Sequence, residues 1–150
     1  MIIDTHAHLM FEEFSDDIEG VLERARVAGV GKIINIACDL KGAKQAVAMA
    51  DAHEELYATV GLHPYESASI NGEMLAKFGE WIADNEKVVA IGECGLDYAK
   101  CEVPPEDQKK AFRMQLDLAS ELEVPVVVHN READEDTLAI LQEFPDVKVV

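Results

Sequence analysis

Two histidines stand one residue apart at the end of the first apolar segment, in Ile3-Asp4-Thr5-His6-Ala7-His8. Side chains alternate between the two faces of a β-strand, so His6 and His8 should point to the same side, about 6–7 Å apart along the strand. Two imidazole rings at this spacing can bind one divalent cation. A His-x-His pair also occurs without any metal, so this pair alone leaves a metal site and a structural role equally open.

Further polar side chains follow later apolar segments of the chain. In chain order they are His63, Glu93, His129 and Arg131. If the apolar segments are parallel strands, their carboxyl ends meet at one edge of the sheet, which is where (β/α) barrels form their active sites. We therefore expect these four side chains to lie close to the two N-terminal histidines. Imidazole and carboxylate ligands without thiolates suit zinc, manganese, iron and nickel, or magnesium where more oxygen ligands are present.

Each of these residues also has a structural interpretation. Glu93 could form a buried ion pair with Arg131, although an ionised carboxylate in an apolar run is costly without a cation. His129 could be a hydrogen-bonded core histidine, and His63 could shape a turn, because a proline follows it. Asp4 is expected to orient one of the histidines through its ring N–H rather than to bind a metal ion directly.

The elements that would position these residues alternate along the chain. Short runs rich in valine and isoleucine are typical of parallel strands buried on both faces, and amphipathic helical segments lie between them. The expected strands are Ile2–His6, Lys32–Ala37, Tyr57–Leu62, Val88–Ile91, Val124–His129 and Val147–Val150. This α/β order predicts an open doubly wound sheet or a (β/α)₈ TIM-type barrel, of which about five βα units and a sixth strand are present.

Composition narrows the class of protein. The 150 residues are expected to form a single domain. The three cysteines, Cys38, Cys94 and Cys101, have no Cys-x-x-Cys spacing, which argues against a disulfide scaffold and a thiolate zinc site. No apolar run reaches the roughly 18–20 residues of a membrane span and no signal peptide is apparent, so we expect no membrane partner and a cytoplasmic location.

The net charge of −17 bears on which substrates are plausible. Proteins that hold nucleic acid through their surface are normally basic. The acidity is most simply a solvated surface that keeps the protein soluble. A polyanionic substrate would have to be met by metal cations and a few local basic residues.

The ordered set of motifs resembles the TatD-like metal-dependent deoxyribonucleases of the amidohydrolase superfamily. Any one motif is weak, but the ordered set is specific and covers essentially the whole chain. The matching stretches are Ile3-Asp4-Thr5-His6-Ala7-His8-Leu9, Gly61-Leu62-His63-Pro64, Ile91-Gly92-Glu93-Cys94-Gly95-Leu96-Asp97-Tyr98 and Val128-His129-Asn130-Arg131-Glu132-Ala133. The helix before the last motif also fits, through Gln108, Phe112, Gln115, Leu116 and Ala119.

This resemblance implies a (β/α)₈ barrel with two divalent metal ions, which would be magnesium, zinc or manganese. His6 and His8 would bind one ion, and His129 would bind the other. Glu93 would bridge both ions, and His63 and Arg131 would contact the phosphate of the substrate. The implied activity is hydrolysis of DNA phosphodiester bonds by a metal-activated water molecule, often as a 3′→5′ exonuclease.

The same family has ligands with no counterpart in this sequence. Its sixth strand leads into another histidine ligand, and a later strand brings an aspartate that binds metal. We therefore expect residues 1–150 to be the N-terminal part of such a barrel, with an incomplete site. Self-association or a complementary C-terminal half are then the expected partners. Two other functions stay open: a metal-dependent hydrolase of a small substrate, and a non-catalytic fragment that acts only through association.

Overall fold

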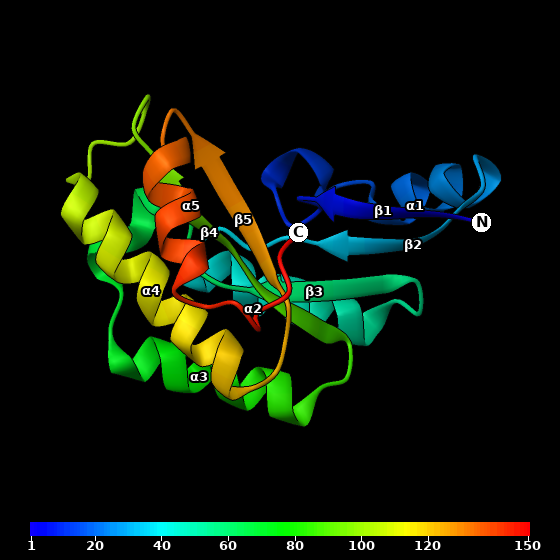
Figure 1. Ribbon diagram of the computed structural model, residues 1–150. Helices are drawn as coiled ribbons and strands as arrows, with labels where there is room; N and C mark the ends of the chain where they lie inside the picture. Colours follow the sequence, from blue (N-terminus) through cyan, green and yellow to red (C-terminus); the bar gives the residue numbers. More distant parts are fainter.

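The computed structural model describes residues 1–150 and contains one parallel five-stranded sheet flanked by helices (Figure 1). The strands are β1 (Ile2–Ala7), β2 (Val30–Asn35), β3 (Leu56–Val60), β4 (Val88–Asp97) and β5 (Val126–Arg131). The α-helices are α1 (Ile18–Val27), α2 (Leu40–Ala52), α3 (Gly72–Asp84), α4 (Pro105–Glu121) and α5 (Asp134–Gln142). Two short 3₁₀ helices, η1 (Glu12–Phe14) and η2 (Pro64–Ser69), follow β1 and β3.

The strands lie side by side in the same order as in the sequence, and each neighbouring pair is parallel. A doubly wound sheet would reverse its strand order at a switch point, whereas a (β/α) barrel adds each strand next to the previous one. The sheet is therefore a half-barrel, which confirms the barrel-type prediction and removes the doubly wound alternative. No helix is both long enough and apolar enough to cross a lipid bilayer.

Two strand predictions differ from the structure by more than two residues at an end. Strand β4 continues six residues past the predicted end at Ile91 and reaches Asp97. The segment Val147–Val150 lies beside β5 but forms a single parallel bridge, between Val126 and Val149, rather than a sixth strand. Three backbone hydrogen bonds join the two segments, Val126 N to Lys148 O, Val150 N to Val126 O and Val128 N to Val150 O. They give the single residue pair Val126–Val149, and a regular strand needs consecutive pairs.

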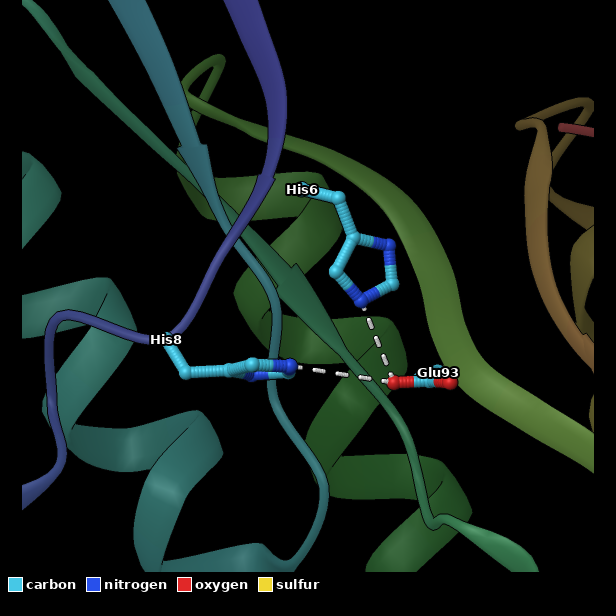
Figure 2. Close-up of side chains that lie close together, drawn as sticks. All are labelled: His6, His8 and Glu93. Carbon is cyan, nitrogen blue, oxygen red and sulfur yellow. Dashed lines mark ion pairs between the residues drawn. The ribbon is translucent and has the colours of Figure 1, made fainter.

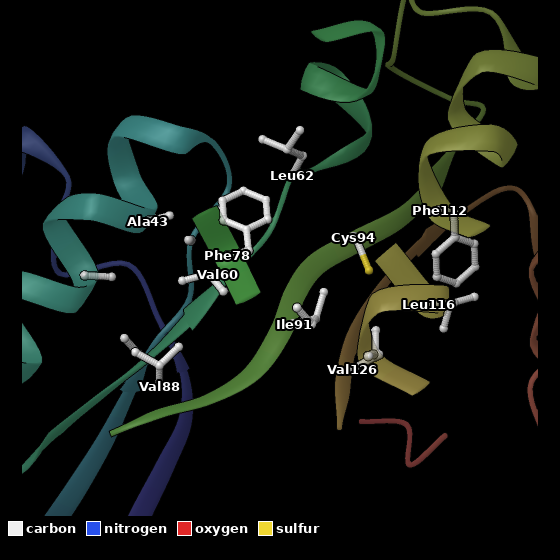
Figure 3. Close-up of a cluster of buried hydrophobic side chains, with 14 of the residues drawn as sticks. Ala43, Val60, Leu62, Phe78, Val88, Ile91, Cys94, Phe112, Leu116 and Val126 are labelled. Atoms are coloured by element: carbon white, nitrogen blue, oxygen red, sulfur yellow. The ribbon is translucent and has the colours of Figure 1, made fainter. Parts of the chain in front are cut away.

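The largest core lies between the sheet and the helices that cover its outer side (Figure 3). Phe112 and Leu116 of α4 pack toward Cys94 of β4 and Val126 of β5, and all four side chains are fully buried. Helix α4 has α3 and α5 as neighbours (Figure 1). This apolar layer fixes the carboxyl ends of β3, β4 and β5 relative to one another, because core side chains are close-packed.

Two glycines let the carboxyl half of β4 approach β5 closely. The register of the pair shifts between Ile91 and Cys94, so Glu93 sits in an irregularity that can re-aim its side chain. Gly92 and Gly95 have φ angles of +134° and +145°, which L side chains rarely adopt. A Cβ atom on Gly95 would lie 2.0 Å from the carbonyl oxygen of His129. A side chain at this position would therefore push the two site-bearing strands apart.

We expect Gly95→Ala to destabilise the fold by about 2 kcal/mol or more, because it adds both a steric clash and backbone strain. Urea unfolding followed by circular dichroism measures this. Gly72→Ala is the matched control, since a Cβ there meets nothing within 4 Å. Equal unfolding midpoints for the two variants would contradict the close approach of β4 to β5.

Candidate metal centre

The two N-terminal histidines and Glu93 form the first group of potential ligands (Figure 2). The Nε2 atom of His6 lies 3.3 Å from Glu93 Oε2, and Nε2 of His8 lies 4.0 Å from the same oxygen. The centroids of the two imidazole rings are 5.1 Å apart. The His-x-His pair therefore does point to one side of β1, and it faces the carboxylate that the later motif supplies.

A second group shares the same carboxylate. His129 Nδ1 lies 2.8 Å from Glu93 Oε1, and His63 Nε2 lies 3.2 Å from His129 Nδ1. Within each group the potential ligand atoms lie within 4.8 Å of one another, which a single ion can span. The carboxyl ends of β1, β3, β4 and β5 thus bring together the four histidines and the glutamate named from the sequence.

Glu93 is a buried carboxylate held among imidazole rings. Its burial acts to raise the pKa of the carboxyl, but the hydrogen bond from His129 and the charges of His6 and His63 outweigh this and keep the pKa below its usual value. Nitrogen and carboxylate ligands without a thiolate fit a divalent ion such as zinc or manganese. Cys38 Sγ lies 3.8 Å from His8 Nδ1, the ring nitrogen that binds the carbonyl oxygen of Ile36, and burial raises the pKa of this thiol to about 12.

A backbone carbonyl orients the ring of His8, and Asp4 orients neither ring of the first pair. His8 Nδ1 donates a 2.7 Å hydrogen bond to the carbonyl oxygen of Ile36, which leaves the lone pair of Nε2 facing Glu93. Asp4 Oδ1 accepts the backbone N–H of His6 at 3.0 Å and does not contact an imidazole ring. The prediction that Asp4 orients a histidine through its ring N–H is therefore wrong. Asp4 is exposed, so its other oxygen has water available in place of a ring N–H.

Two buried glutamines of α4 hold the segments that carry the site. Gln115 accepts the N–H of Leu62 at 2.7 Å and donates to the carbonyl of the same residue at 3.1 Å, just before His63. Gln108 makes the equivalent pair of bonds with the backbone of Asp97, at 2.8 and 3.1 Å. The two glutamines are seven residues apart, so they lie on one face of the helix. The two glutamines thus satisfy backbone groups at the end of β4 and just beyond the end of β3.

Arg131 pairs with Asp97 rather than with Glu93. Its Nη1 lies 3.3 Å from Asp97 Oδ2, so the predicted structural alternative of a Glu93–Arg131 ion pair is wrong. Asp97 is fully buried and also contacts His129 Nε2 at 3.1 Å. The sequence motif contains Asp97 but predicts no role for it. The run of residues gave no signal for this position, because Gly92 and Gly95 interrupt the apolar segment before Asp97.

Comparison with known proteins identifies the family. The sequence profile of the family described as TatD related DNase matches residues 3–150. The chain belongs to the TatD family. The TatD relatives include "Uncharacterized metal-dependent hydrolase YabD" of Bacillus subtilis strain 168, which is 41% identical over 143 residues. That match covers 95% of this chain and 56% of the relative. The "3'-5' ssDNA/RNA exonuclease TatD" of Erwinia tasmaniensis is 37% identical, over 94% of this chain and 54% of the relative.

Solved structures agree with the TatD assignment. The crystal structure of YjjV, a TatD homologue from Escherichia coli K12, superposes with a TM-score of 0.89 at 35% identity. It matches over 97% of this chain and 57% of its own. A TatD family hydrolase from Entamoeba histolytica gives a TM-score of 0.88 at 26% identity, over 96% of this chain and 54% of its own. This chain thus spans about half the length of the TatD relatives that it matches.

The two histidines of the second group should titrate far apart in the metal-free protein. Burial and the nearby charge of His129 lower the pKa of His63 to about 4. The hydrogen bond to Glu93, followed by the one to Asp97, raises the pKa of His129 above 6.5. Histidine NMR signals followed against pH measure both values, and His63→Gln should remove the low one. Titration of both rings near pH 6.5 would contradict this geometry.

These shifts also set the sign of the pH dependence of stability. The unfolded chain binds a proton at His63 from about pH 6.5 downward, whereas the folded chain does so only near pH 4. His63 therefore destabilises the fold as the pH falls through that window. His129 contributes the opposite effect, because its stabilisation is complete below pH 6.5 and is lost as the pH rises through its raised folded pKa.

Proposed function

We propose that this protein is, or is the N-terminal part of, a metal-dependent hydrolase that cleaves phosphodiester bonds of DNA as an exonuclease. The observation that carries the proposal is the pair of His/Glu groups that share Glu93. A carboxylate common to two groups of nitrogen ligands is the arrangement expected for two neighbouring divalent ions. Family membership supports the same chemistry, since the relatives are named as a metal-dependent hydrolase and as ssDNA/RNA exonucleases.

Each ligand would have a distinct task. His6 and His8 would hold one ion, His129 the other, and Glu93 would bridge them. Magnesium, manganese or zinc, when bound, would supply an activated water molecule and would offset the negative charge of the reacting phosphate. The backbone carbonyl that holds His8 Nδ1 keeps that ring from turning its Nε2 lone pair away from the centre.

His63 and Arg131 would bind the phosphate. The backbone N–H of Tyr65 donates to His63 Nδ1 at 3.3 Å, which leaves the ring proton on Nε2, the nitrogen that faces the second group. The low pKa of His63 keeps this ring neutral at pH 7, so it can donate one hydrogen bond to a phosphate oxygen. The side chain of Arg131 is 43% exposed and uses Nη1 on Asp97, with its other N–H groups free for a second oxygen.

The net negative charge of the protein gives a reason why it would bind a phosphate through metal ions. The protein carries a net charge of −17, and long-range attraction of a polyanion is not available to it. Two divalent ions would place four positive charges where the phosphate must sit. Binding should then depend on metal loading much more than on surface lysines and arginines.

The deciding experiment combines metal analysis with a nuclease assay. The purified protein is loaded with magnesium, manganese or zinc, passed through a sizing column and incubated with 5′-labelled single-stranded DNA. Products that shorten one nucleotide at a time would support a 3′→5′ exonuclease. Cleavage of bis(p-nitrophenyl) phosphate without cleavage of DNA would instead indicate a small-substrate hydrolase. Metal-free, inactive protein would indicate a non-catalytic role, and the sizing column tests the predicted self-association.

Glu93→Gln should lose metal and activity together, with activity falling by about 100-fold or more, because the amide carries no charge to hold two cations. Elemental analysis after dialysis measures bound metal, and the DNA assay measures activity. Glu80→Gln is the matched control, since Glu80 pairs with Lys77 on the exposed side of α3. Full metal content in Glu93→Gln would show that the bridging assignment is wrong.

Arg131→Ala should raise KM for DNA by about tenfold while bound metal stays unchanged, since a charge-assisted hydrogen bond to the phosphate is lost. Initial rates over a range of DNA concentrations measure this. Arg113→Ala removes the same charge from the outer face, where Arg113 pairs with Glu143, and should leave KM unaltered. Equal effects of the two variants would mean that Arg131 does not contact the substrate.

A further inference from the structure

We propose that Asp97 is a positioning residue of the metal centre, which holds the Nε2–H of His129 and thereby keeps Nδ1 of that ring directed at the ion. The inference rests on the metal-dependent function proposed above. Neither the motif resemblance nor the relatives assign a role to this aspartate. The contacts of the two carboxylate oxygens of Asp97 and of the two ring nitrogens of His129 support this role.

Asp97 is fixed on all sides. It is fully buried at the end of β4. Its Oδ1 accepts the backbone N–H groups of Ala99 and Lys100, at 3.0 and 2.8 Å. Its own backbone is held by Gln108, which accepts its N–H and donates to its carbonyl. The carboxylate therefore cannot rotate without breaking the turn after β4, and Oδ2 stays where it is.

Oδ2 is the oxygen that faces the site. It lies 3.1 Å from His129 Nε2 and 3.3 Å from Arg131 Nη1. An ionised carboxylate can only accept hydrogen bonds, so the ring nitrogen that faces it must carry the proton. The guanidinium beside it compensates the buried negative charge. Asp97 thus faces His129 as a charged acceptor in a fixed place.

The opposite edge of the same ring faces the metal centre. His129 Nδ1 lies 2.8 Å from Glu93 Oε1 and 3.2 Å from His63 Nε2, the members of the second ligand group. Only Nδ1 is therefore near enough to share an ion with Glu93. A carboxylate that holds the far N–H of a ligating histidine fixes the tautomer and the ring orientation and strengthens the ligand.

Asp97→Asn would replace the hydrogen-bond acceptor Oδ2 with a donor. The N–H groups of Ala99 and Lys100 require an acceptor, so the amide oxygen would take the place of Oδ1. The amide NH₂ would then take the place of Oδ2 and donate to His129 Nε2. That ring nitrogen would have to accept, so the neutral ring would carry its proton on Nδ1, which a metal ion needs free.

The first measurement is zinc affinity by competition with a chromophoric chelator. We expect Asp97→Asn to bind the second zinc ion 10- to 100-fold more weakly than the unmodified protein, the usual cost of losing such a partner. Asp136→Asn is the matched control, because Asp136 accepts the hydroxyl of Tyr98 nearby and does not contact His129. Unchanged zinc affinity in a folded Asp97→Asn protein would overturn the proposal.

A second measurement needs no variant of Asp97. The protein is labelled with ¹⁵N-histidine and loaded with ¹¹³Cd²⁺, and the His129 signals are assigned by their absence in His129→Gln. Cadmium coupling to Nδ1, with a slowly exchanging proton on Nε2, is expected. Coupling to Nε2 would overturn the role of Asp97 while leaving the metal-dependent function intact. Failure of the unmodified protein to bind zinc or cadmium would overturn both.

Discussion

An ionised carboxylate that is buried among strands loses its hydration and needs cations or hydrogen-bond donors in its place. Glu93 is such a group, and it is 9% exposed at the carboxyl end of β4. Three imidazole rings surround it: His6, His8 and His129 each have a ring nitrogen within 4.0 Å of a Glu93 oxygen. The positions of the other site residues follow from the need to surround this one charge.

Two kinds of contact give the surrounding histidines a fixed direction. His8 is held from behind by a backbone carbonyl, and His129 is held from behind by the carboxylate of Asp97. In both rings the nitrogen that faces away from Glu93 is occupied, so the other nitrogen is left to face it. Side chains of α4 complete the backbone hydrogen bonds at the end of β4 and just beyond the end of β3. The rigidity of the centre therefore comes from the outer layer of helices as much as from the sheet.

Much of this site could be predicted because parallel strands end at a common edge. His6, His8, His63, Glu93 and His129 all follow apolar runs, and that fact alone placed them together. The extension of β4 to Asp97 could not be predicted from the run of residues, since Gly92 and Gly95 are poor strand formers. Their strand geometry depends on the approach of β5, where a Cβ would clash with the neighbouring backbone. Asp97 therefore lies beyond the predicted end of this strand at Ile91, and its contact with His129 was not predicted.

The arrangement of charge around Arg131 bears on how a polyanion could bind here. In a chain of net charge −17, the obvious cation at the strand ends is Arg131. The structure engages this guanidinium with the buried carboxylate of Asp97, so part of its charge is already neutralised. The side chains of the site therefore bring too little free positive charge to hold a phosphate by themselves. In the proposed function, divalent ions held by the histidines and Glu93 would supply the missing charge. Recognition of the substrate and its chemistry would then depend on the same cations.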